Sequence, residues 1–399
     1  MNRTFLESIS AASLLAAVVI AVPLAAQEMS ATQEWKVCRS AGAEERKAAI
    51  IGFDVPGAGT GSGQGTLPFA ITASGTITGF YCDAVTCHGF LRARDGAFTT
   101  FDAPNDVNGT YPFAINRHGA ITGNYTDANG VNHGFLRHRD GAITTFDVAG
   151  AGTVLNQGTF AANINPRGEI AGYYIDNNNV SHGFVRARDG AIATFDAPGA
   201  GKGAGQGTFT TFTDGLNPAG TIAGYYVDTN GAGHGYVRAP GGAITTFDVA
   251  GAATGSGQGT LVAGINPAGE ISGNWFDANT ASHGYVRSPD GTIAKYDVKG
   301  AGTGFRQGTV GAAINPAGEL VSYWADDNSV VHGYVRSPRG AITKFDVPGA
   351  GTGAGQGTFP FVNSPSGEIA GYYVDANGVN HGFLRLSCQR DDDDIEDGR

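Results

Sequence analysis

The chain has 399 residues, of which 64 are glycine, 41% are hydrophobic and 15% are charged, and its formal net charge is −11. The hydrophobic fraction is that of a folded protein, so the glycines indicate turns rather than disorder. The acidic balance argues against nucleic acid or an anionic membrane surface as the partner, because both are bound through basic patches.

The N-terminus has the pattern of an export signal. Arg3 precedes the apolar run AASLLAAVVIAVPLAA, which ends in small residues near Ala26. The run is short for a membrane helix and is interrupted by Pro23. We expect residues 1–26 to be a signal peptide and residues 27–46 a linker. The mature protein is then secreted, periplasmic or displayed on the cell surface, with no membrane span after signal cleavage.

A repeat occupies most of the remaining chain. His-Gly followed by Phe or Tyr occurs seven times, at His88, His133, His182, His234, His283, His332 and His381. The gaps between successive histidines are 45, 49, 52, 49, 49 and 49 residues. A unit of this length is typical of a propeller blade.

Each copy contains four strand-like pieces, as the fifth copy illustrates. GTLVAGIN (259–266) predicts a first strand, and NPAG (266–269) matches a type I turn. EISGNWFD and HGYVR predict a second and a third strand. Asp290–Gly291 is typical of a two-residue hairpin turn, and TIAKYDV predicts the fourth strand. A glycine-rich loop ending in QGT leads into the next copy.

The two ends of the repeat decide between a ring and a linear array. The first repetitive piece, AAIIGFDVPG (48–57), matches only a fourth strand, whereas HGFLRLSC (381–388) stops after a third. The numbers of strands balance if the N-terminal strand completes the last blade, which removes exposed sheet edges. The sequence therefore predicts an all-β fold: a seven-bladed β-propeller of four-stranded antiparallel blades over residues 47–388.

The repeat resembles a known family. The order of features in INPAGEIAGYYVDANGVNHGFLR, assembled from several copies, is similar to the bacterial extracellular HAF repeats, named after their His-Ala-Phe triplet. Here Gly replaces the Ala, and Arg follows where the family tends to have Trp. The resemblance covers roughly residues 48–388. It implies an exported propeller of a related type, and it supplies no catalytic residues.

Four cysteines fit an oxidising compartment. Cys82 and Cys87 flank one tight turn and form a candidate disulfide. Cys38 and Cys388 lie just outside the two ends of the repeat, so a bridge between them would join the termini. Residues 389–399 form an acidic tail, which we expect to be solvated and disordered.

The repeated polar residues do not predict a metal site or a cofactor. The histidines start successive third strands, too far apart to share one ion, so a repeated structural hydrogen bond is favoured. Turns such as DANG and DDNS begin like calcium loops but lack the downstream ligands. They are interpreted as hairpin turns that leave weak calcium binding open.

The candidate ligand site is placed where the repetition breaks. Most second strands end in Tyr, but the fifth and sixth copies have Trp275 and Trp324, and the loop between them adds Lys299, Phe305 and Arg306. Aromatic rings with a cation at one boundary predict a stacking platform for a sugar ring or an anionic polymer. The alternative is that the large rings only fill space between blades.

A glutamine recurs just before most first strands, and Gln258 and Gln307 are the copies nearest to this candidate platform. These side chains would either line the mouth of the central channel or hydrogen-bond between loops.

Three functions remain open at this point. The first is a non-catalytic monomer that binds a carbohydrate or another extracellular polymer or protein on its long-loop face. The second is a polysaccharide hydrolase or lyase that uses aspartates near the channel mouth, although we find no catalytic signature. The third is a structural surface scaffold. The near-identity of the copies limits this choice, because residues repeated in every copy are explained by the blade.

Overall fold

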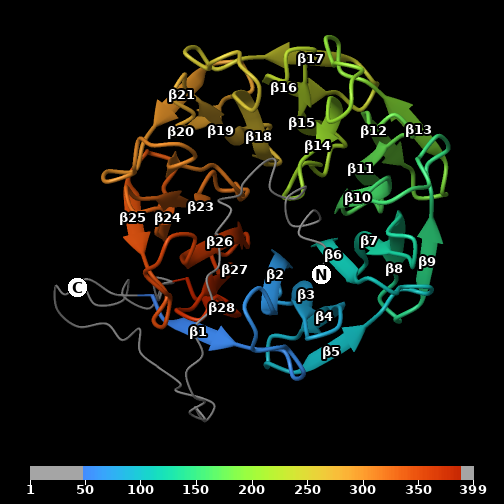
Figure 1. Cartoon of the computed structure of the whole chain (residues 1–399), viewed down its shortest axis with the longest axis horizontal. Coiled ribbons are helices and arrows are strands. Elements are labelled where there is room, and N and C mark those ends of the chain that lie inside the picture. Colours follow the sequence, from blue (N-terminus) through green and yellow to red (C-terminus); the bar gives the residue numbers. More distant parts are fainter. Residues whose placement is uncertain (1–47, 388–399) are drawn as a thin grey trace, which may run out of the picture.

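The computed structural model describes residues 48–387, which form an all-β ring (Figure 1). This part of the chain contains 28 strands joined into one sheet and no helix. It therefore has no helix with the length and hydrophobicity needed to cross a membrane. The predicted signal peptide, Cys38, Cys388 and the acidic tail lie outside the described residues.

The strand pairings divide the ring into consecutive antiparallel sets of four, numbered from set 1 (β2–β5) to set 7 (β26–β28 with β1). The first, innermost strands are β2 (Gly65–Ile71), β6 (Thr110–Ile115), β10 (Gly158–Ile164), β14 (Gly207–Thr210), β18 (Gly259–Ile265), β22 (Gly308–Thr309) and β26 (Gly357–Asn363). The second strands are β3 (Ile77–Cys82), β7 (Ile121–Thr126), β11 (Ile170–Ile175), β15 (Ile222–Val227), β19 (Ile271–Phe276), β23 (Leu320–Ala325) and β27 (Ile369–Val374).

The outer half of each set consists of a third and a fourth strand. The third strands are β4 (Cys87–Arg92), β8 (Asn132–Arg137), β12 (Ser181–Arg186), β16 (Gly233–Arg238), β20 (Ser282–Arg287), β24 (Val331–Arg336) and β28 (Asn380–Arg385). The fourth strands are β5 (Phe98–Phe101), β9 (Ile143–Phe146), β13 (Ile192–Phe195), β17 (Ile244–Phe247), β21 (Ile293–Tyr296), β25 (Ile342–Phe345) and β1 (Ile50–Phe53).

The N-terminal strand pairs with the C-terminal one. Ile50 lies opposite Arg385 and Phe53 opposite Gly382, so β1 is the fourth strand of set 7. The loop after β1 then leads into β2, whose Gly65 bridges to Asn380 of β28. Both ends of the described chain thus meet within one set, which has four strands like the others.

An aromatic ring at the end of each fourth strand joins neighbouring sets. On one side it covers the glycine of the His-Gly pair in its own set, where a Cβ atom would lie only 2.4–2.9 Å from the ring. On the other side lies the guanidinium of the next set's third strand, 4.7–5.0 Å from the ring centroid. The ring–arginine pairs are Phe53–Arg92, Phe101–Arg137, Phe146–Arg186, Phe195–Arg238, Phe247–Arg287, Tyr296–Arg336 and Phe345–Arg385.

A buried threonine makes a second contact between sets. In Gln-Gly-Thr, or Asn-Gly-Thr in set 2, the hydroxyl accepts a backbone N–H that lies just after the preceding fourth strand, at 2.9–3.0 Å. The first such pair is Val55 with Thr66 and the last is Val347 with Thr358. Because these hydroxyls are fully buried, each one satisfies a backbone donor that water cannot reach.

Aromatic side chains from the innermost strands fill the centre of the ring. Phe69 packs on Phe113 and Phe361, with centroid distances of 5.5 and 5.1 Å. Phe212 lies 4.8 Å from Phe113 and comes from the fourth copy, which ends the 52-residue gap. These contacts join sets 1, 2, 4 and 7 across the axis, so the sequence irregularity in set 4 supplies part of the central core.

The packing of an aromatic side chain on the glycine of each His-Gly pair can be tested directly. We expect Gly183→Ala to lower the free energy of unfolding by about 1–3 kcal/mol, because the new Cβ would overpack against Phe195. Gly241→Ala is the matched control, since a Cβ there meets nothing within 4 Å. Urea denaturation measures both. Equal midpoints for the two variants would contradict the argument.

Candidate functional site

The structure buries the two tryptophans that the sequence singles out. Trp275 and Trp324 are only 9% and 7% exposed, and they belong to separate hydrophobic clusters. One face of each indole stacks on a histidine, His283 or His332, at 4.3 and 4.4 Å between centroids. A lysine ammonium lies over each ring as well. The rings are therefore occupied by protein groups, and the structure does not bring them together as one open platform.

Each of these two tryptophans is paired with a lysine from the fourth strand of its own set. Lys295 lies 5.2 Å from the centroid of Trp275, and Lys344 lies 4.6 Å from that of Trp324. In set 1 the corresponding residues are Tyr81 and Thr100, which form a hydrogen bond. Set 1 thus pairs a phenol with a hydroxyl at the position where sets 5 and 6 pair an indole with a cation. Trp275 and Trp324 thus fill space within their own sets, as in the space-filling interpretation.

The other members of the predicted platform lie on the surface. Phe305 is 71% exposed, and the Arg306 guanidinium lies 5.4 Å from its ring centroid. The backbone N–H of Arg306 donates to Thr280 in the turn between β19 and β20. Lys299 is exposed, and its carbonyl accepts a hydrogen bond from Lys344. Phe305 and Arg306 therefore form a separate surface pair on the loop before β22.

The two glutamines are engaged in loop contacts. The amide N–H groups of Gln258 and Gln307 donate to the carbonyls of Ala278 and Asp327 in second-to-third-strand turns. Their Oε1 atoms accept N–H groups within their own loops, at 3.0 and 2.9 Å. Their backbone carbonyls make a further contact. Each one accepts the first N–H of the preceding third strand, as Gln258 does from Gly233.

Each repeated histidine lies between two aspartates. Its Nδ1 is 2.8–3.0 Å from the aspartate after the fourth strand, and its Nε2 is 3.5–3.8 Å from the turn aspartate after the second strand. This is the strand-to-loop hydrogen bond that the sequence favours. The turn aspartates also accept N–H groups of their own turns, as Asp127 does from Val131 at 2.9 Å. Residues 48–387 contain no cluster of three or more His, Cys, Asp or Glu side chains suited to a metal ion.

The junction between sets 1 and 2 departs from the others. At the other six junctions the glycine that opens the first strand makes a parallel bridge to the preceding third strand. In set 2 the loop is shorter, with Asn108 in place of Gln, and the described pairings include no bridge between β4 and β6. The Asn108 carbonyl instead accepts the hydroxyl of Tyr111 at 2.9 Å. A tyrosine ring thus lies beside the third strand of set 1.

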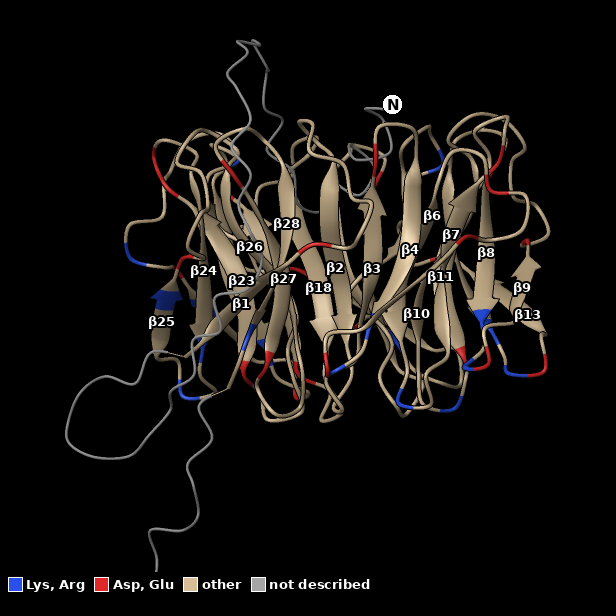
Figure 2. Cartoon of the chain, turned by 90° about the horizontal axis from the view of Figure 1, so that it is seen from below, with Lys and Arg blue, Asp and Glu red and all other residues tan. Residues whose placement is uncertain are grey.

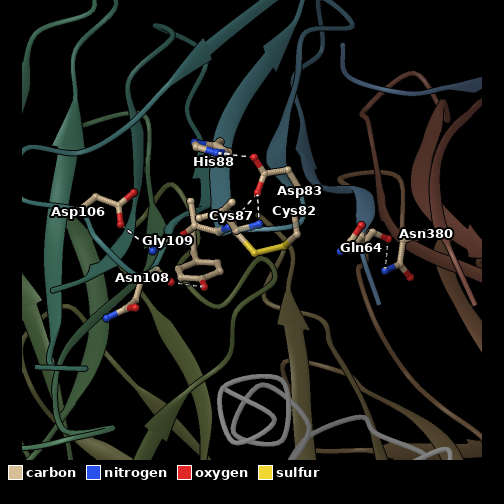
Figure 3. Close-up of a disulfide and its surroundings, with 12 residues drawn as sticks. Gln64, Cys82, Asp83, Cys87, His88, Asp106, Asn108, Gly109 and Asn380 are labelled. Carbon is tan, nitrogen blue, oxygen red and sulfur yellow. Dashed lines mark hydrogen bonds and ion pairs between the residues drawn. A yellow bond between two sulfur atoms is a disulfide. The ribbon is translucent and has the colours of Figure 1, made fainter. Parts of the chain in front are cut away.

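A pocket of about 210 Å³, which we name the junction pocket, opens at this place on the long-loop face. Its apolar wall consists of Leu67, Phe80, Tyr111 and the disulfide between Cys82 and Cys87. The amides that line it are Asn108, Asn132, Asn156 and Asn380. Figure 3 shows the disulfide between Asn108 on one side and the Gln64–Asn380 contact on the other. Three of these amides donate to backbone carbonyls: Asn108 to Asp127, Asn132 to Gln157 and Asn380 to Gln64.

Exposed aliphatic side chains lie on the loops around this pocket. Val85, which also lines it, is 84% exposed in the disulfide turn, and Val107 is 57% exposed in the shortened loop. Val154 and Leu155 are 57% and 53% exposed in the loop before β10. Asn156, the next residue, lines the pocket. With Phe305 and Ile51 these four are the exposed large hydrophobic residues of the described chain, so apolar exposure gathers at this junction.

The charges near the junction pocket are acidic. The backbone N–H groups of Thr86 and Val85 lower the pKa of Asp83. At Asp127 burial acts in the opposite direction, but the N–H groups of Val131 and Asn129 lower its pKa overall. Both carboxylates are therefore ionised at neutral pH. Most Lys and Arg residues lie instead along the opposite, lower edge of the ring in Figure 2.

A second cavity of about 70 Å³ lies near the axis and contains one carboxyl. Asp214 lines it together with Phe212 and Leu216, and desolvation raises the pKa of Asp214 to about 6 although the residue is exposed on its other side. No second carboxyl lines this cavity. A glycosidase mechanism needs two carboxyls about 5–10 Å apart, and this cavity alone does not supply them.

Sequence reasoning missed the junction pocket, although two signals point to it. The gap between the first two histidines is 45 residues rather than 49, and only that hairpin carries a cysteine pair. Both signals mark the same junction. The redirected Tyr111 hydroxyl has no such signal, because a tyrosine or phenylalanine is an ordinary residue in a first strand.

The fold resembles solved structures, whereas no protein-family model and no curated protein sequence matches the chain. A streptogramin B lyase is 14% identical with a TM-score of 0.53, over 85% of this chain and 98% of that one. A catalytically inactive virginiamycin B lyase from Staphylococcus aureus, solved with quinupristin, is 14% identical with a TM-score of 0.54, over 86% of this chain and 100% of that one. The BP39L lectin from Burkholderia pseudomallei is 10% identical with a TM-score of 0.53, over 86% of this chain and 97% of that one. These neighbours are β-propeller-like repeat proteins.

The fold is that of a β-propeller. At these identities the likeness extends to the architecture and not to the activity.

The indole–lysine pairs predict a coupling between two positions. We expect Lys344→Thr and Trp324→Tyr each to lower the free energy of unfolding, because each leaves its partner without the cation–π contact. The double variant recreates the tyrosine–threonine pair of set 1 and should lose about 0.5–1 kcal/mol less than the sum of the single variants. Urea denaturation of all four proteins measures this coupling. Strict additivity would contradict it.

Ring closure predicts a dependence of stability on pH. The hydrogen bond that the His381 ring donates to the Asp54 carboxylate raises the pKa of His381 above its ordinary value of about 6.5. The stabilisation by protonated His381 is therefore fully present below about pH 6.5 and is lost as pH rises through the raised pKa. Thermal melting should show that Asp54→Asn lowers the Tm more at acidic than at alkaline pH. Asp140→Asn, in an exposed turn, is the control, and a Tm difference that grows with pH would contradict the argument.

Proposed function

We propose that the protein is an exported, monomeric seven-bladed β-propeller, with each four-stranded set as one blade, and that it binds an extracellular ligand at the junction pocket without catalysing a reaction. The pairing of β1 with β28 supports closure by the N-terminal strand. The His-Gly repeats support a relationship to the HAF type, and the apolar run before Ala26 supports export.

One observation carries the choice of site: the regular seam between sets is interrupted where a pocket and four exposed aliphatic side chains occur together. At the other junctions the loop glycine approaches the preceding backbone so closely that a Cβ would lie within 1.9–2.1 Å of a carbonyl oxygen. That contact leaves no room for a ligand group. Gly109 faces the Tyr111 hydroxyl instead, so the seam is open at this one place.

The size and chemistry of the pocket favour an apolar group. An engineered apolar cavity of about 150 Å³ binds benzene, so a pocket of about 210 Å³ accepts a single ring or a branched aliphatic chain. Three of the four amides that line it already donate to backbone carbonyls. Few polar partners therefore remain for the hydroxyls of a sugar chain, and the pocket fits an apolar ligand group better than a polysaccharide.

The enzymatic alternative has weaker support. Asp214 has the raised pKa that a general acid requires, but its cavity contributes a single carboxyl. The aspartates after the fourth strands are hydrogen-bonded to the repeated histidines. A hydrolase or lyase would release products from a polysaccharide panel, whereas a structural scaffold would bind no small ligand at all.

Thermal melting against a panel of glycans, aromatic compounds and peptides tests the proposal. A ligand present at 100 times its Kd adds about 2.7 kcal/mol to the native state, which raises the Tm measurably. We expect the shift to be lost in the Val85→Ser/Leu155→Ser variant, because these exposed side chains would supply apolar contact to the ligand. The Phe305→Ala/Arg306→Ala variant should keep the shift.

The two variants also separate the competing sites. A shift that disappears only in the Phe305→Ala/Arg306→Ala variant would place the ligand on the loop before β22 and overturn the junction pocket. The absence of a shift across the whole panel would favour the scaffold.

A further inference from the structure

We propose that the ligand of the junction pocket is a polypeptide segment that inserts one aromatic or large aliphatic side chain and carries Lys or Arg on either side of it. This inference rests on the proposed function and specifies its partner. Four features of the described residues support it: the volume of the pocket, the exposed aliphatic side chains around it, the negative charge of the surrounding loops, and the hydrogen bonds that the lining amides already make.

The pocket accepts one side chain. Its wall of Leu67, Phe80, Tyr111 and the disulfide is apolar on several sides. Phe80 and Tyr111 meet edge to face, with centroids 5.1 Å apart, so an entering ring meets an aromatic corner. A single indole, phenol or leucine-sized group fills a space of about 210 Å³, and burial of such a group supplies most of the affinity of a typical peptide anchor.

The apolar surface extends beyond the pocket. Val107 lies on one loop beside it, and Val154 and Leu155 lie on another. The Leu155 side chain covers the turn at Gly130, where a Cβ would lie 2.3 Å from its Cδ1. An occupant that used only the pocket would leave these side chains in water. A peptide that continues past its anchor covers them, which favours a chain over an isolated ring compound.

The surrounding charge selects a cationic chain. The loop and turn segments around the pocket span residues 54–65, 83–87, 102–109, 126–132 and 147–158. They contain Asp54, Asp83, Asp102, Asp106, Asp127 and Asp147 and neither Lys nor Arg. His88 and His133 each approach two of these carboxylates, but the six aspartates outnumber the two histidines, so the segments stay acidic at neutral pH. Lys or Arg beside the anchor would therefore gain attraction and a faster encounter.

The acidity also disfavours two other occupants. A second copy of this chain would bring the same aspartates against themselves, because a two-fold interface is self-complementary. A glycan would need free amide and hydroxyl partners, and Asn108, Asn132 and Asn380 donate to backbone carbonyls instead.

Isothermal titration calorimetry of the mature protein with three synthetic peptides tests the inference. The probe is acetyl-Gly-Lys-Lys-Trp-Lys-Lys-Gly-amide; one comparison peptide replaces its tryptophan with alanine, and the other replaces its lysines with glutamates. We expect the probe to bind at least tenfold more tightly than the alanine peptide, because the anchor is lost. The glutamate peptide should show no binding, and the Kd of the probe should rise with salt.

Protein variants assign the binding to the pocket. Val85→Ser/Leu155→Ser should weaken binding of the probe at least tenfold. Asp127→Asn should weaken it severalfold, because Asn keeps an oxygen for the two backbone N–H groups of the turn but removes the charge. Phe305→Ala changes another exposed hydrophobic side chain on the same face and should leave the Kd unchanged. Equal melting temperatures of the variants without ligand establish that the fold is intact.

Other outcomes overturn the inference in distinguishable ways. Equal affinities of the tryptophan and alanine peptides would show that charge alone attracts the peptide and that no side chain enters the pocket. A glycan or a small aromatic compound could raise the Tm in a way that depends on Val85 and Leu155, while no peptide binds. That result would reject a peptide as the ligand but keep the junction pocket as the binding site. Self-association abolished by Val85→Ser/Leu155→Ser would identify a second copy as the occupant. No binding and no shift would overturn both.

Discussion

The ring depends on one aromatic side chain per set, placed between a glycine of its own set and an arginine of the next. Phe101 shows the constraint: its ring lies where a Cβ of Gly89 would be, and Arg137 from the next set covers its other face. A larger residue at the glycine would displace the ring, and a shorter residue at the arginine would leave it uncovered. Burial lowers the pKa of the Arg137 guanidinium, although the nearby Asp140 acts in the opposite direction. The electron-rich face of the ring offsets part of the cost of burial. The Gly of each His-Gly pair and the Arg at the end of each third strand are thus the two partners of the aromatic ring.

This arrangement allows one junction to vary. Between sets 1 and 2 the backbone bridge and the glutamine contact are missing from the described pairings, yet Arg137 still covers Phe101 and Ala103 still donates to Thr110. Those two contacts join the sets at the outer strands and beneath the loops. The loops at this junction can therefore enclose a pocket while the two sets stay in contact. The contacts that join the two sets and the pocket proposed to bind a ligand thus lie in different parts of the same junction.

Spacing and turn chemistry are enough to predict the regular part of the fold. The Asn-Pro-x-Gly and Asp-Gly turns, the four strands of each copy and the pairing of the N-terminal strand with the last copy all have local signals, and the structure contains them. Contacts between distant positions have no such signal. Trp324 and Lys344 are 20 residues apart, and only the strand register places the ammonium over the indole. For this reason the tryptophans suggest an open platform in the sequence, whereas their faces are covered in the structure. The redirected hydroxyl of Tyr111 is hidden from the sequence for the same reason.

Closure of the ring concentrates several contacts in one short strand. β1 has only four residues, yet Phe53 covers Gly382 and receives Arg92, while Asp54, the next residue, hydrogen-bonds His381. The first two contacts join set 7 to itself and to set 1, and the third fixes the loop after the strand. Because β1 pairs with a strand more than 300 residues away, its closure entropy is offset only after the last set has formed. The closing junction then uses the same ring, glycine and arginine as every other junction. A circular array therefore needs no special closing element, only a fourth strand supplied from the opposite end of the chain.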